Sequence, residues 1–393
     1  MAKPLGFEKP LGMRDILPES LAKQRYLEAA LRGQIEKWGY EEIATPSLEY
    51  YDTVGEASLT TTERMFKLLD KQGHTVVLRP DMTAPIARVV SSLYKQVPFP
   101  IRLYYQANVF RAQEKEAGRN AEFYQTGVEL IGDHSVDADA EVIALAVACL
   151  QSAGVTSFKV AIGHADFMDG LLEEIVPDRS YHEQFRQFLH DRDYVGYRQL
   201  VDSLPIAEEG RERLHALLRL RGGKAKIEQA RQLTVNGKAR QAVQTIQSLW
   251  EALEAYGVTE HLLLDFNLVL NLNYYTGTVF EGYAADLGSP LIGGGRYDHL
   301  LARFGRPAPA TGFAIKMDRL LQVTSSRPEP KKLGLLILYT EPNRRRALLE
   351  AQRQRQLGRV VLTQLIGHAA DAGAFVTRDD VEVIEMTGEG EAG

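Results

Sequence analysis

One stretch of the chain, residues 268–281 with the sequence LVLNLNYYTGTVFE, constrains the fold most strongly. It begins apolar, passes through the neighbouring Tyr274 and Tyr275, and ends in a Thr-Val-Phe run that favours a β-strand. A turn of three successive glycines at 293–295 follows. Two interpretations stay open. The stretch is either a hairpin joining two core strands, or a pocket wall in which tyrosines supply flat surface and hydroxyls while glycines let a ligand approach the backbone.

The composition is that of an ordinary globular protein. The 393 residues are 45% hydrophobic and 25% charged. The net charge of −6 provides no global basic field that would draw the chain to nucleic acid. The single cysteine, Cys149, lies in an apolar helical run and is expected in the core, and no Cys/His cluster has the spacing of a zinc site. We therefore predict no metal and no cofactor.

Neither a membrane segment nor a secretion signal is visible in the sequence. No apolar run approaches the roughly 20 residues that cross a bilayer. The beginning of the chain does not show the charged, apolar and small-residue pattern of a signal peptide. We therefore expect a cytoplasmic protein.

The first regular elements form a helix followed by a strand. Apolar residues recur at three- and four-residue steps over 19–38 and predict a helix that ends at Gly39. Residues 40–48 alternate like a strand and are interrupted by Pro46. This pair of elements is interpreted as a dimerisation unit, although a buried pair within one subunit would show the same pattern.

Polar residues then mark the start of a second helix. Two short strands are predicted at 65–70 and 75–78, and a helix at 84–94. Asp81 and Thr83 precede this helix, where either side chain could cap it. The alternative is that both face the ammonium group of a ligand.

Two long strands at 101–110 and 122–130 are predicted to form an antiparallel pair, joined by a charged loop at 112–120. Gln125 and Glu129 share one face of the second strand, because side chains alternate along a strand. Burying them is unfavourable unless they find partners. A ligand-binding face explains them best. The alternative is an internal ion pair between Glu129 and an arginine.

The remaining elements suggest an insertion and a small last unit. After a helix at 138–152 and a strand at 158–162, residues 168–262 are charged, rich in Leu and Arg, and mostly helical. Their charge runs are interpreted as solvated helix faces. A short strand and a helix are expected within 313–323, and a linker at 325–332.

Beyond the linker, a small α/β unit is predicted, with a disordered tail at 387–393. Its expected elements are strands at 333–339, 360–364 and 381–386 and a helix at 342–357.

Six motifs follow one another along the chain: GMRDILP at 12–18, LRPDMT at 78–83, YQANVFR at 105–111, EFYQTGVE at 122–129, NYYTGTVFE at 273–281 and GGGRYD at 293–298. Together and in this order they resemble the catalytic domain of the class II histidyl-tRNA synthetases. The resemblance covers roughly residues 1–325. It implies an α+β fold with a six-stranded antiparallel sheet flanked by helices, and a dimer formed through the first helix and strand.

The resemblance also implies a division into domains. Residues 1–167 and 263–325 would form the synthetase-like domain, and residues 168–262 its helical insertion. Residues 326–393 would form a truncated C-terminal α/β unit with the disordered tail.

The departures from the synthetase pattern concern the reaction. Leu270 stands where the family has its catalytic arginine, and Asn273 where it has an aspartate. Adenylate formation builds negative charge on the attacked phosphate, and losing one preorganised donor there typically costs about 3 kcal/mol. The resemblance therefore implies a chain without catalytic residues.

The nucleotide side departs as well. The residues after Arg111 read AQEK, and Ala121 replaces an expected arginine. Lys316 occupies the place of a glycine over which the nucleotide should lie, while Arg319 survives. Lys316 and Arg319 are candidates for an anion-binding remnant.

The amino-acid side of the pattern is preserved. By resemblance, two residues would hold the ammonium group of histidine, two its carboxylate and three its imidazole. In that order they are Asp81 and Thr83, Arg111 and Gln125, and Glu129, Tyr274 and Tyr275. Charge-assisted hydrogen bonds of this kind give both affinity and orientation. The pocket is thus expected to bind L-histidine without activating it.

A synthetase-like body with an altered nucleotide site and a short last unit resembles the regulatory subunits of ATP phosphoribosyltransferase. That resemblance implies a non-catalytic subunit in the first step of histidine biosynthesis, needed by a short-form catalytic partner and involved in histidine feedback. It also implies a homodimer within a hetero-oligomer. Two alternatives remain, an active histidyl-tRNA synthetase and a synthetase-derived tRNA-binding or sensor module. Leu270 argues against the first, and the acidic charge balance makes tRNA binding an unfavoured expectation.

Overall fold

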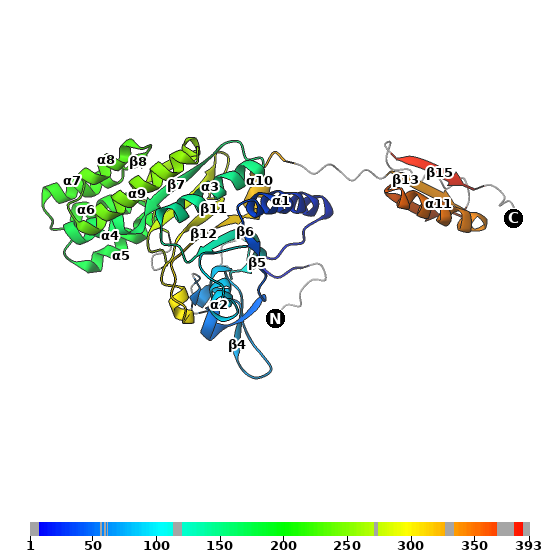
Figure 1. The fold of residues 1–393 in the computed structure, drawn as a ribbon, viewed down its shortest axis with the longest axis horizontal. Helices are drawn as coiled ribbons and strands as arrows, with labels where there is room; N and C mark the ends of the chain where they lie inside the picture. Colours follow the sequence, from blue (N-terminus) through cyan, green and yellow to red (C-terminus); the bar gives the residue numbers. More distant parts are fainter. Residues whose placement is uncertain are drawn as a thin grey trace. The chain divides into compact units, whose positions relative to one another are not determined.

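The computed structural model describes residues 8–387 without positions 56, 59 and 61 and without the segments 113–119, 271–273, 327–333 and 368–380. The chain divides into two compact units, Met1–Arg327 and Pro328–Gly393 (Figure 1). The predicted linker at 325–332 and tail at 387–393 lie largely outside the described residues.

The larger unit is built on one sheet whose central six strands are antiparallel to their neighbours. In spatial order these strands are β5 (Ile101–Phe110), β6 (Glu122–Ile131), β12 (Ala310–Lys316), β11 (Ile292–Arg296), β10 (Thr278–Ala284) and β7 (Phe158–His164). The expected α+β fold with a six-stranded antiparallel sheet is confirmed. The stretch of residues 268–281 ends within β10, which pairs with β11 as a hairpin.

Three short strands extend this sheet to nine. β1 (Glu41–Glu42) pairs parallel to β5 at one edge. At the other edge, β9 (Leu262–Asp265) pairs parallel to β7, and β8 (Arg221–Gly222) pairs antiparallel to β9. β1 lies within the strand predicted from residue 40, whereas β8 and β9 were not predicted, because they depend on pairing between segments that are distant in the sequence.

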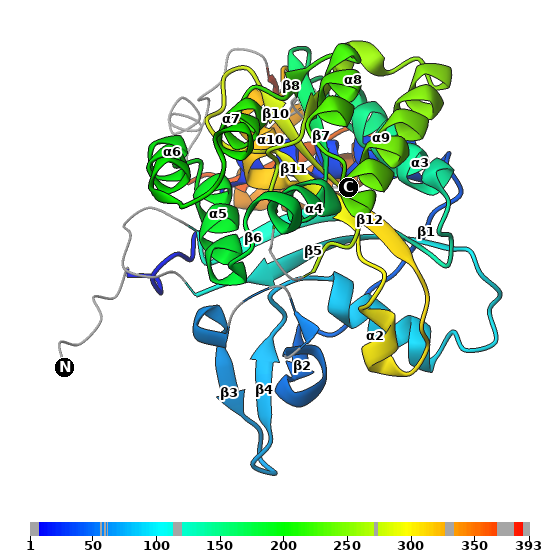
Figure 2. The same cartoon turned by 90° about the vertical axis from the view of Figure 1, so that its left-hand side faces the viewer.

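The strand predicted from residue 40 and expected to stop at Pro46 is shorter than predicted, because β1 covers only two residues. The chain leaves the main sheet after β1 and enters a separate three-stranded sheet at β2 (Leu48–Tyr50), which pairs with β4 (Thr75–Leu78). β3 (Lys67–Leu69) completes that sheet (Figure 2). Pro46 lies between the two segments and has no amide hydrogen to donate to a ladder, so the strand cannot continue through it.

Helices cover one face of the main sheet and bury the larger core. α1 (Pro18–Glu36) and α3 (Val136–Ser152) pack there, whereas α2 (Thr83–Ser92) lies on the opposite face (Figure 1). α3 begins where the hydroxyl of Ser135 accepts a hydrogen bond from the Ala138 amide at 3.2 Å, which caps the helix. Cys149 is fully buried on α3, as predicted, and burial raises the pKa of its thiol.

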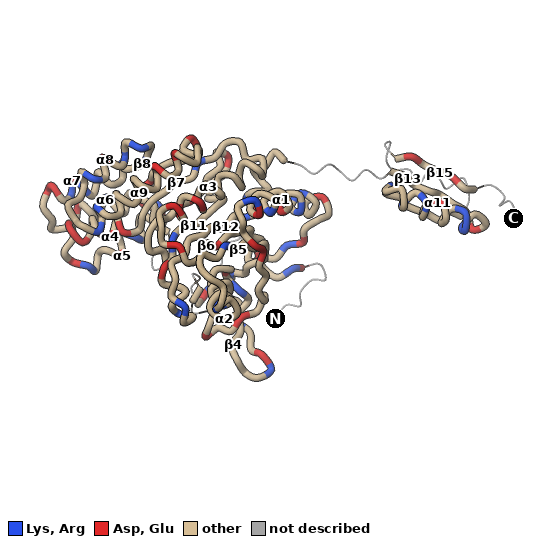
Figure 3. The backbone as a smooth tube through the Cα atoms, viewed as in Figure 1, with Lys and Arg blue, Asp and Glu red and all other residues tan. Residues whose placement is uncertain are grey.

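The segment predicted as a helical insertion is helical apart from β8 and the start of β9. α9 (Gly237–Ala255) packs against α4 (Ala165–Ile175) and α3. The outer helices are α5 (His182–His190), α6 (Tyr194–Ser203), α7 (Glu208–Leu217) and α8 (Ala225–Gln232). Figure 3 shows positively and negatively charged residues interspersed along these helices, as expected for solvated faces. This segment belongs to the same compact unit as the sheet, and the predicted domain boundaries stay a prediction.

The smaller unit is a parallel sheet with one described helix. β13 (Leu335–Tyr339) lies between β14 (Val361–Leu365) and β15 (Glu382–Met386), and α11 (Arg344–Gln356) packs on this sheet. Short hydrophobic strands and the helix between them were all predicted to within a few residues. Among the described residues of the whole chain, no helix has the length and apolar character needed to cross a membrane.

Candidate binding pocket

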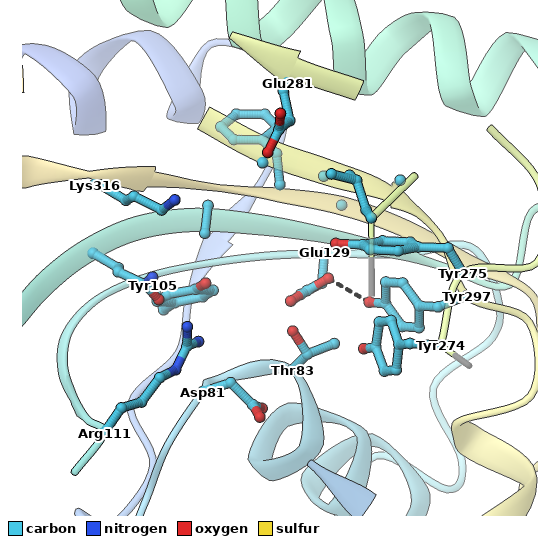
Figure 4. Close-up of a pocket in the computed structure, with 18 of the residues that line it drawn as sticks. Asp81, Thr83, Tyr105, Arg111, Glu129, Tyr274, Tyr275, Glu281, Tyr297 and Lys316 are labelled. Atoms are coloured by element: carbon cyan, nitrogen blue, oxygen red, sulfur yellow. Dashed lines mark hydrogen bonds between the residues drawn. The ribbon is translucent and has the colours of Figure 1, made fainter. Parts of the chain in front are cut away.

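A cavity of about 220 Å³ opens on the face of the main sheet that carries α2. Its lining includes all seven residues predicted for a histidine site: Asp81, Thr83, Arg111, Gln125, Glu129, Tyr274 and Tyr275 (Figure 4). These residues come from segments up to nearly two hundred positions apart, and the antiparallel order of the strands brings them together.

Glu129 lies in the middle of the cavity wall and is 3% exposed. Its carboxyl accepts a hydrogen bond from the Tyr297 hydroxyl, and the Thr83 hydroxyl also hydrogen-bonds to it. Burial raises the pKa of Glu129 to about 8, and these two hydrogen bonds act in the opposite direction. Among the described residues, no lysine or arginine lies within ion-pair distance of this carboxyl. The alternative of an internal ion pair with arginine therefore has no counterpart there.

A group of tyrosines forms one end of the cavity. Tyr274 stacks on Tyr297 with ring centroids 5.1 Å apart, and it meets Tyr275 edge-to-face at 5.2 Å. The Tyr274 hydroxyl is buried beside Thr83, but it makes no well-aligned hydrogen bond with the described residues. Buried polar groups usually have a partner, so this hydroxyl is available to a ligand.

Glycines in the neighbouring strands give Glu129 and the tyrosines their space. A Cβ atom at Gly312 would overlap the Glu129 carboxyl, and one at Gly127 would overlap the Tyr105 hydroxyl. Any larger residue at these positions would displace a cavity side chain. Tyr274 and Tyr275 of the stretch 268–281 line the cavity, and the stretch runs into the β10–β11 hairpin, so the two interpretations of it do not exclude each other. The approach of a ligand to the glycines stays a prediction.

Asp81 both caps a helix and lines the cavity. It accepts a hydrogen bond from the Ala84 amide at 3.1 Å, near the start of α2, and another from the Ser58 hydroxyl. It is only 4% exposed. The capping interpretation thus holds for Asp81, whereas the Thr83 hydroxyl is directed to Glu129.

The opposite end of the cavity is cationic. Figure 4 shows Arg111 and Lys316 on the side of the cavity away from Tyr274, Tyr275 and Tyr297, with Glu129 between the two groups. Arg111 donates from Nε to the Pro80 carbonyl at 2.9 Å, and its guanidinium lies 5.2 Å from the centre of the Phe123 ring. Burial, the largest cause, and the charges of Arg319 and Arg111 together lower the pKa of Lys316 to about 8, while the charge of Glu281 acts in the opposite direction.

The two candidates for an anion-binding remnant are placed differently. Lys316 lines the cavity. Arg319 does not line it and donates to the Pro290 carbonyl at 2.6 Å. Leu270 does line the cavity, so an apolar side chain occupies the catalytic arginine position implied by the resemblance. Asn273 and the AQEK residues from 113 onward lie outside the described residues.

Several lining residues were not selected from the sequence, namely Tyr105, His190, Glu281, Tyr297 and Gly312. Tyr297 stands in the quoted GGGRYD motif, which gave a usable signal, whereas Tyr105 is an ordinary aromatic residue of a strand. His190 comes from the end of α5, and nothing in the local sequence indicates that this helix reaches the sheet.

The similarity of this chain to known proteins first identifies the class of protein to which it belongs. The family profile described as histidyl-tRNA synthetase matches residues 12–320. A histidine–tRNA ligase subunit from Alicyclobacillus acidocaldarius is 30% identical, with a TM-score of 0.70 over 82% of this chain and 98% of that chain. The histidyl-tRNA synthetase from Nostoc, at 19% identity, shares the fold with a TM-score of 0.78 over 94% of this chain and 89% of its own. The fold is therefore that of a class II, histidyl-tRNA synthetase-like protein.

Relatives with a more specific name match nearly the whole chain. The ATP phosphoribosyltransferase regulatory subunit from Halalkalibacterium halodurans is 46% identical over 99% of both chains, and that from Bacillus subtilis is 46% identical over 92% of both. A crystal structure from Bacillus halodurans, described as an ATP phosphoribosyltransferase regulatory subunit/histidyl-tRNA synthetase, has a TM-score of 0.88 at 45% identity over 98% of this chain and 100% of that chain. The chain belongs to the family of ATP phosphoribosyltransferase regulatory subunits. The resemblance inferred from the motifs is confirmed.

Proposed function

We propose that this regulatory subunit performs no chemistry itself, activates a short-form catalytic subunit of ATP phosphoribosyltransferase in the first step of histidine biosynthesis, and binds L-histidine in its cavity as a feedback signal. The observation that carries the proposal is the combination of a retained amino-acid pocket with Leu270 in the position of the catalytic arginine. The residues predicted to bind histidine are present, whereas the arginine needed for adenylate formation is replaced by Leu270.

The charge arrangement of the pocket supports a histidine ligand. The ring would lie among the tyrosines against Glu129, the ammonium group near Asp81 and Thr83, and the carboxylate at Arg111 and Gln125. A Glu129 carboxyl with a pKa of about 8 holds its proton at neutral pH. Imidazole, whose ordinary pKa is about 6.5, can share that proton without changing the total buried charge. This avoids the penalty of burying an unpaired ion.

The size of the cavity also favours an amino acid over a nucleotide adduct. Sites for drug-sized ligands usually measure about 300–1,000 Å³, and this cavity measures about 220 Å³. Lys316 projects into the same space. Activation would further need a cation beside the attacked phosphate, which Leu270 cannot supply.

Feedback requires that histidine bind the states of the complex unequally. The cavity is lined by residues of the sheet, the start of α2 and, through His190, the helical insertion. A ligand there contacts elements from several parts of the larger unit. A shift of one of these elements between states is therefore able to change the affinity for histidine. The homodimer, the disfavoured tRNA binding and the cytoplasmic location stay predictions.

Calorimetric titration of the purified chain with L-histidine tests the proposal. Wild type should bind, and Glu129→Gln should weaken binding about 10- to 100-fold, the effect of losing a charge-assisted hydrogen bond. Glu228→Gln is the matched control, because Glu228 pairs with Arg231 on the exposed surface of α8. Equal affinities for wild type and Glu129→Gln would place histidine elsewhere. Histidine-dependent pyrophosphate–ATP exchange by the pure chain would make it an active synthetase.

A further inference from the structure

Lys316 has an ammonium group that the described protein does not pair. It is the last residue of β12 and lines the cavity. Among the described residues, no carboxylate lies within ion-pair distance of its Nζ and no acceptor lies within hydrogen-bond distance. The lining carboxylate Glu281 is instead engaged by Arg192, at 3.3 Å, and by the Tyr283 hydroxyl. A half-buried amine without a partner is costly, so its place in the cavity calls for an anionic group.

The strand register places this amine beside the predicted carboxylate contacts. Lys316 on β12 is the direct cross-strand partner of Gln125 on β6. Side chains opposite each other in an antiparallel pair project from the same face with Cβ atoms about 5 Å apart. Arg111 lies on the same side of the cavity (Figure 4). Three donors from three segments therefore converge at the cationic end.

The positive charges of Arg111 and Lys316 repel each other, and the nearby Glu281 carboxylate offsets part of this repulsion at Lys316. Arg111 and Lys316 both line the cavity, and the charge of Arg111 lowers the pKa of Lys316. A carboxylate between them would accept charge-assisted hydrogen bonds from both. At the other end, Glu129 and the tyrosines suit a ring with N–H groups. A ligand with a ring at one end and a carboxylate at the other would use both groups of side chains.

We propose that Lys316 is a specificity-determining residue that binds the free α-carboxylate of the ligand together with Arg111 and Gln125. The pocket then distinguishes L-histidine from compounds that carry the same ring and amine but no carboxylate, such as the alcohol L-histidinol. This inference rests on the proposed function and extends it. Lys316 would then have two effects. It occupies space that a nucleotide would need, and it binds the carboxylate that adenylation would modify.

Calorimetry on the full chain with two ligands and four proteins tests the assignment. Wild type should bind L-histidine about 10- to 100-fold more tightly than L-histidinol. Lys316→Met should lower the affinity for histidine at least tenfold and leave that for histidinol unchanged, so that the discrimination disappears. Lys316→Arg should retain most of it. Lys71→Met, in the exposed turn between β3 and β4, should change neither affinity.

Unchanged histidinol binding also shows that Lys316→Met is folded. Equal losses for both ligands in Lys316→Met would overturn the assignment, and so would a wild type that binds histidinol as tightly as histidine. The comparison of histidine with histidinol uses only the wild-type chain. It therefore tests the assignment even if Lys316→Met does not fold. Failure of the proposed function looks different, because wild type would then bind no histidine at all.

Discussion

At the scale of single residues, the cavity contains a carboxyl group that works against the stability of the fold. The folded state holds the Glu129 proton up to a pKa of about 8, whereas the ordinary pKa is 4.5. Between these values the folded chain binds more protons than the unfolded chain, so stability decreases as pH rises from about 4.5 to 8. Above about pH 8 the full free-energy cost of ionising the buried Glu129 carboxyl is present.

Glu129→Gln removes this titration and should be more stable than wild type in alkaline solution. The difference in unfolding free energy between the two proteins should grow with pH and reach on the order of a few kcal/mol above pH 8. Denaturant unfolding from pH 5 to pH 9 measures it. A difference that stays constant over this range would show that Glu129 is not buried in the way described.

The residues that could be selected from the sequence were those that lie in motifs. Glu129 and Gln125 stand out because polar side chains interrupt an apolar strand face. Tyr105 did not stand out, because an aromatic residue on a strand is ordinary and only the glycine opposite reveals its position. His190 depends on how α5 packs, which no local pattern encodes.

At the scale of elements, a buried ion pair fixes β11 to the start of α3. Arg296 lies 2.9 Å from Asp139, and the two side chains are 8% and 3% exposed. Arg296 also donates to the Asp133 and Ser135 carbonyls at 3.0 Å. These contacts fix the position of the glycine-rich strand β11. They also fix Tyr297, the next residue in the chain, which lines the cavity.

Arg296→Met should destabilise the chain by about 3–5 kcal/mol, because it leaves the Asp139 carboxylate buried without its partner. Arg231→Met is the matched control. Its ion pair with Glu228 is exposed, and such pairs contribute about 0–1 kcal/mol. Urea unfolding of the three proteins measures both effects. Equal midpoints for Arg296→Met and Arg231→Met would contradict the role assigned to the buried pair.

Element prediction succeeded where the signal is local and failed where it is not. The long strands β5 and β6 follow from their alternation of polar residues with apolar and aromatic ones. The split of residues 40–48 between two sheets turns on Pro46 and on partners elsewhere in the chain. The short strands at the sheet edges likewise depend on neighbours that a linear pattern does not show.

At the scale of the whole molecule, composition and periodicity gave only a globular protein with an insertion and a small last unit. The order of the six motifs gave the class II fold, and the departures within them separated a regulatory subunit from a synthetase. The size of the cavity and the placement of its tyrosines and cations at different ends required the structure, since they depend on strand register and on glycines facing bulky neighbours.

The most direct test of the central claim is reconstitution with a purified short-form catalytic subunit, measuring phosphoribosyltransferase activity with and without L-histidine. The wild-type chain should raise the activity of the catalytic subunit, and histidine should suppress it. Glu129→Gln should still activate, but suppression should need at least ten times more histidine. No gain in activity on adding the wild-type chain, or a Glu129→Gln complex as sensitive to histidine as wild type, would contradict the account.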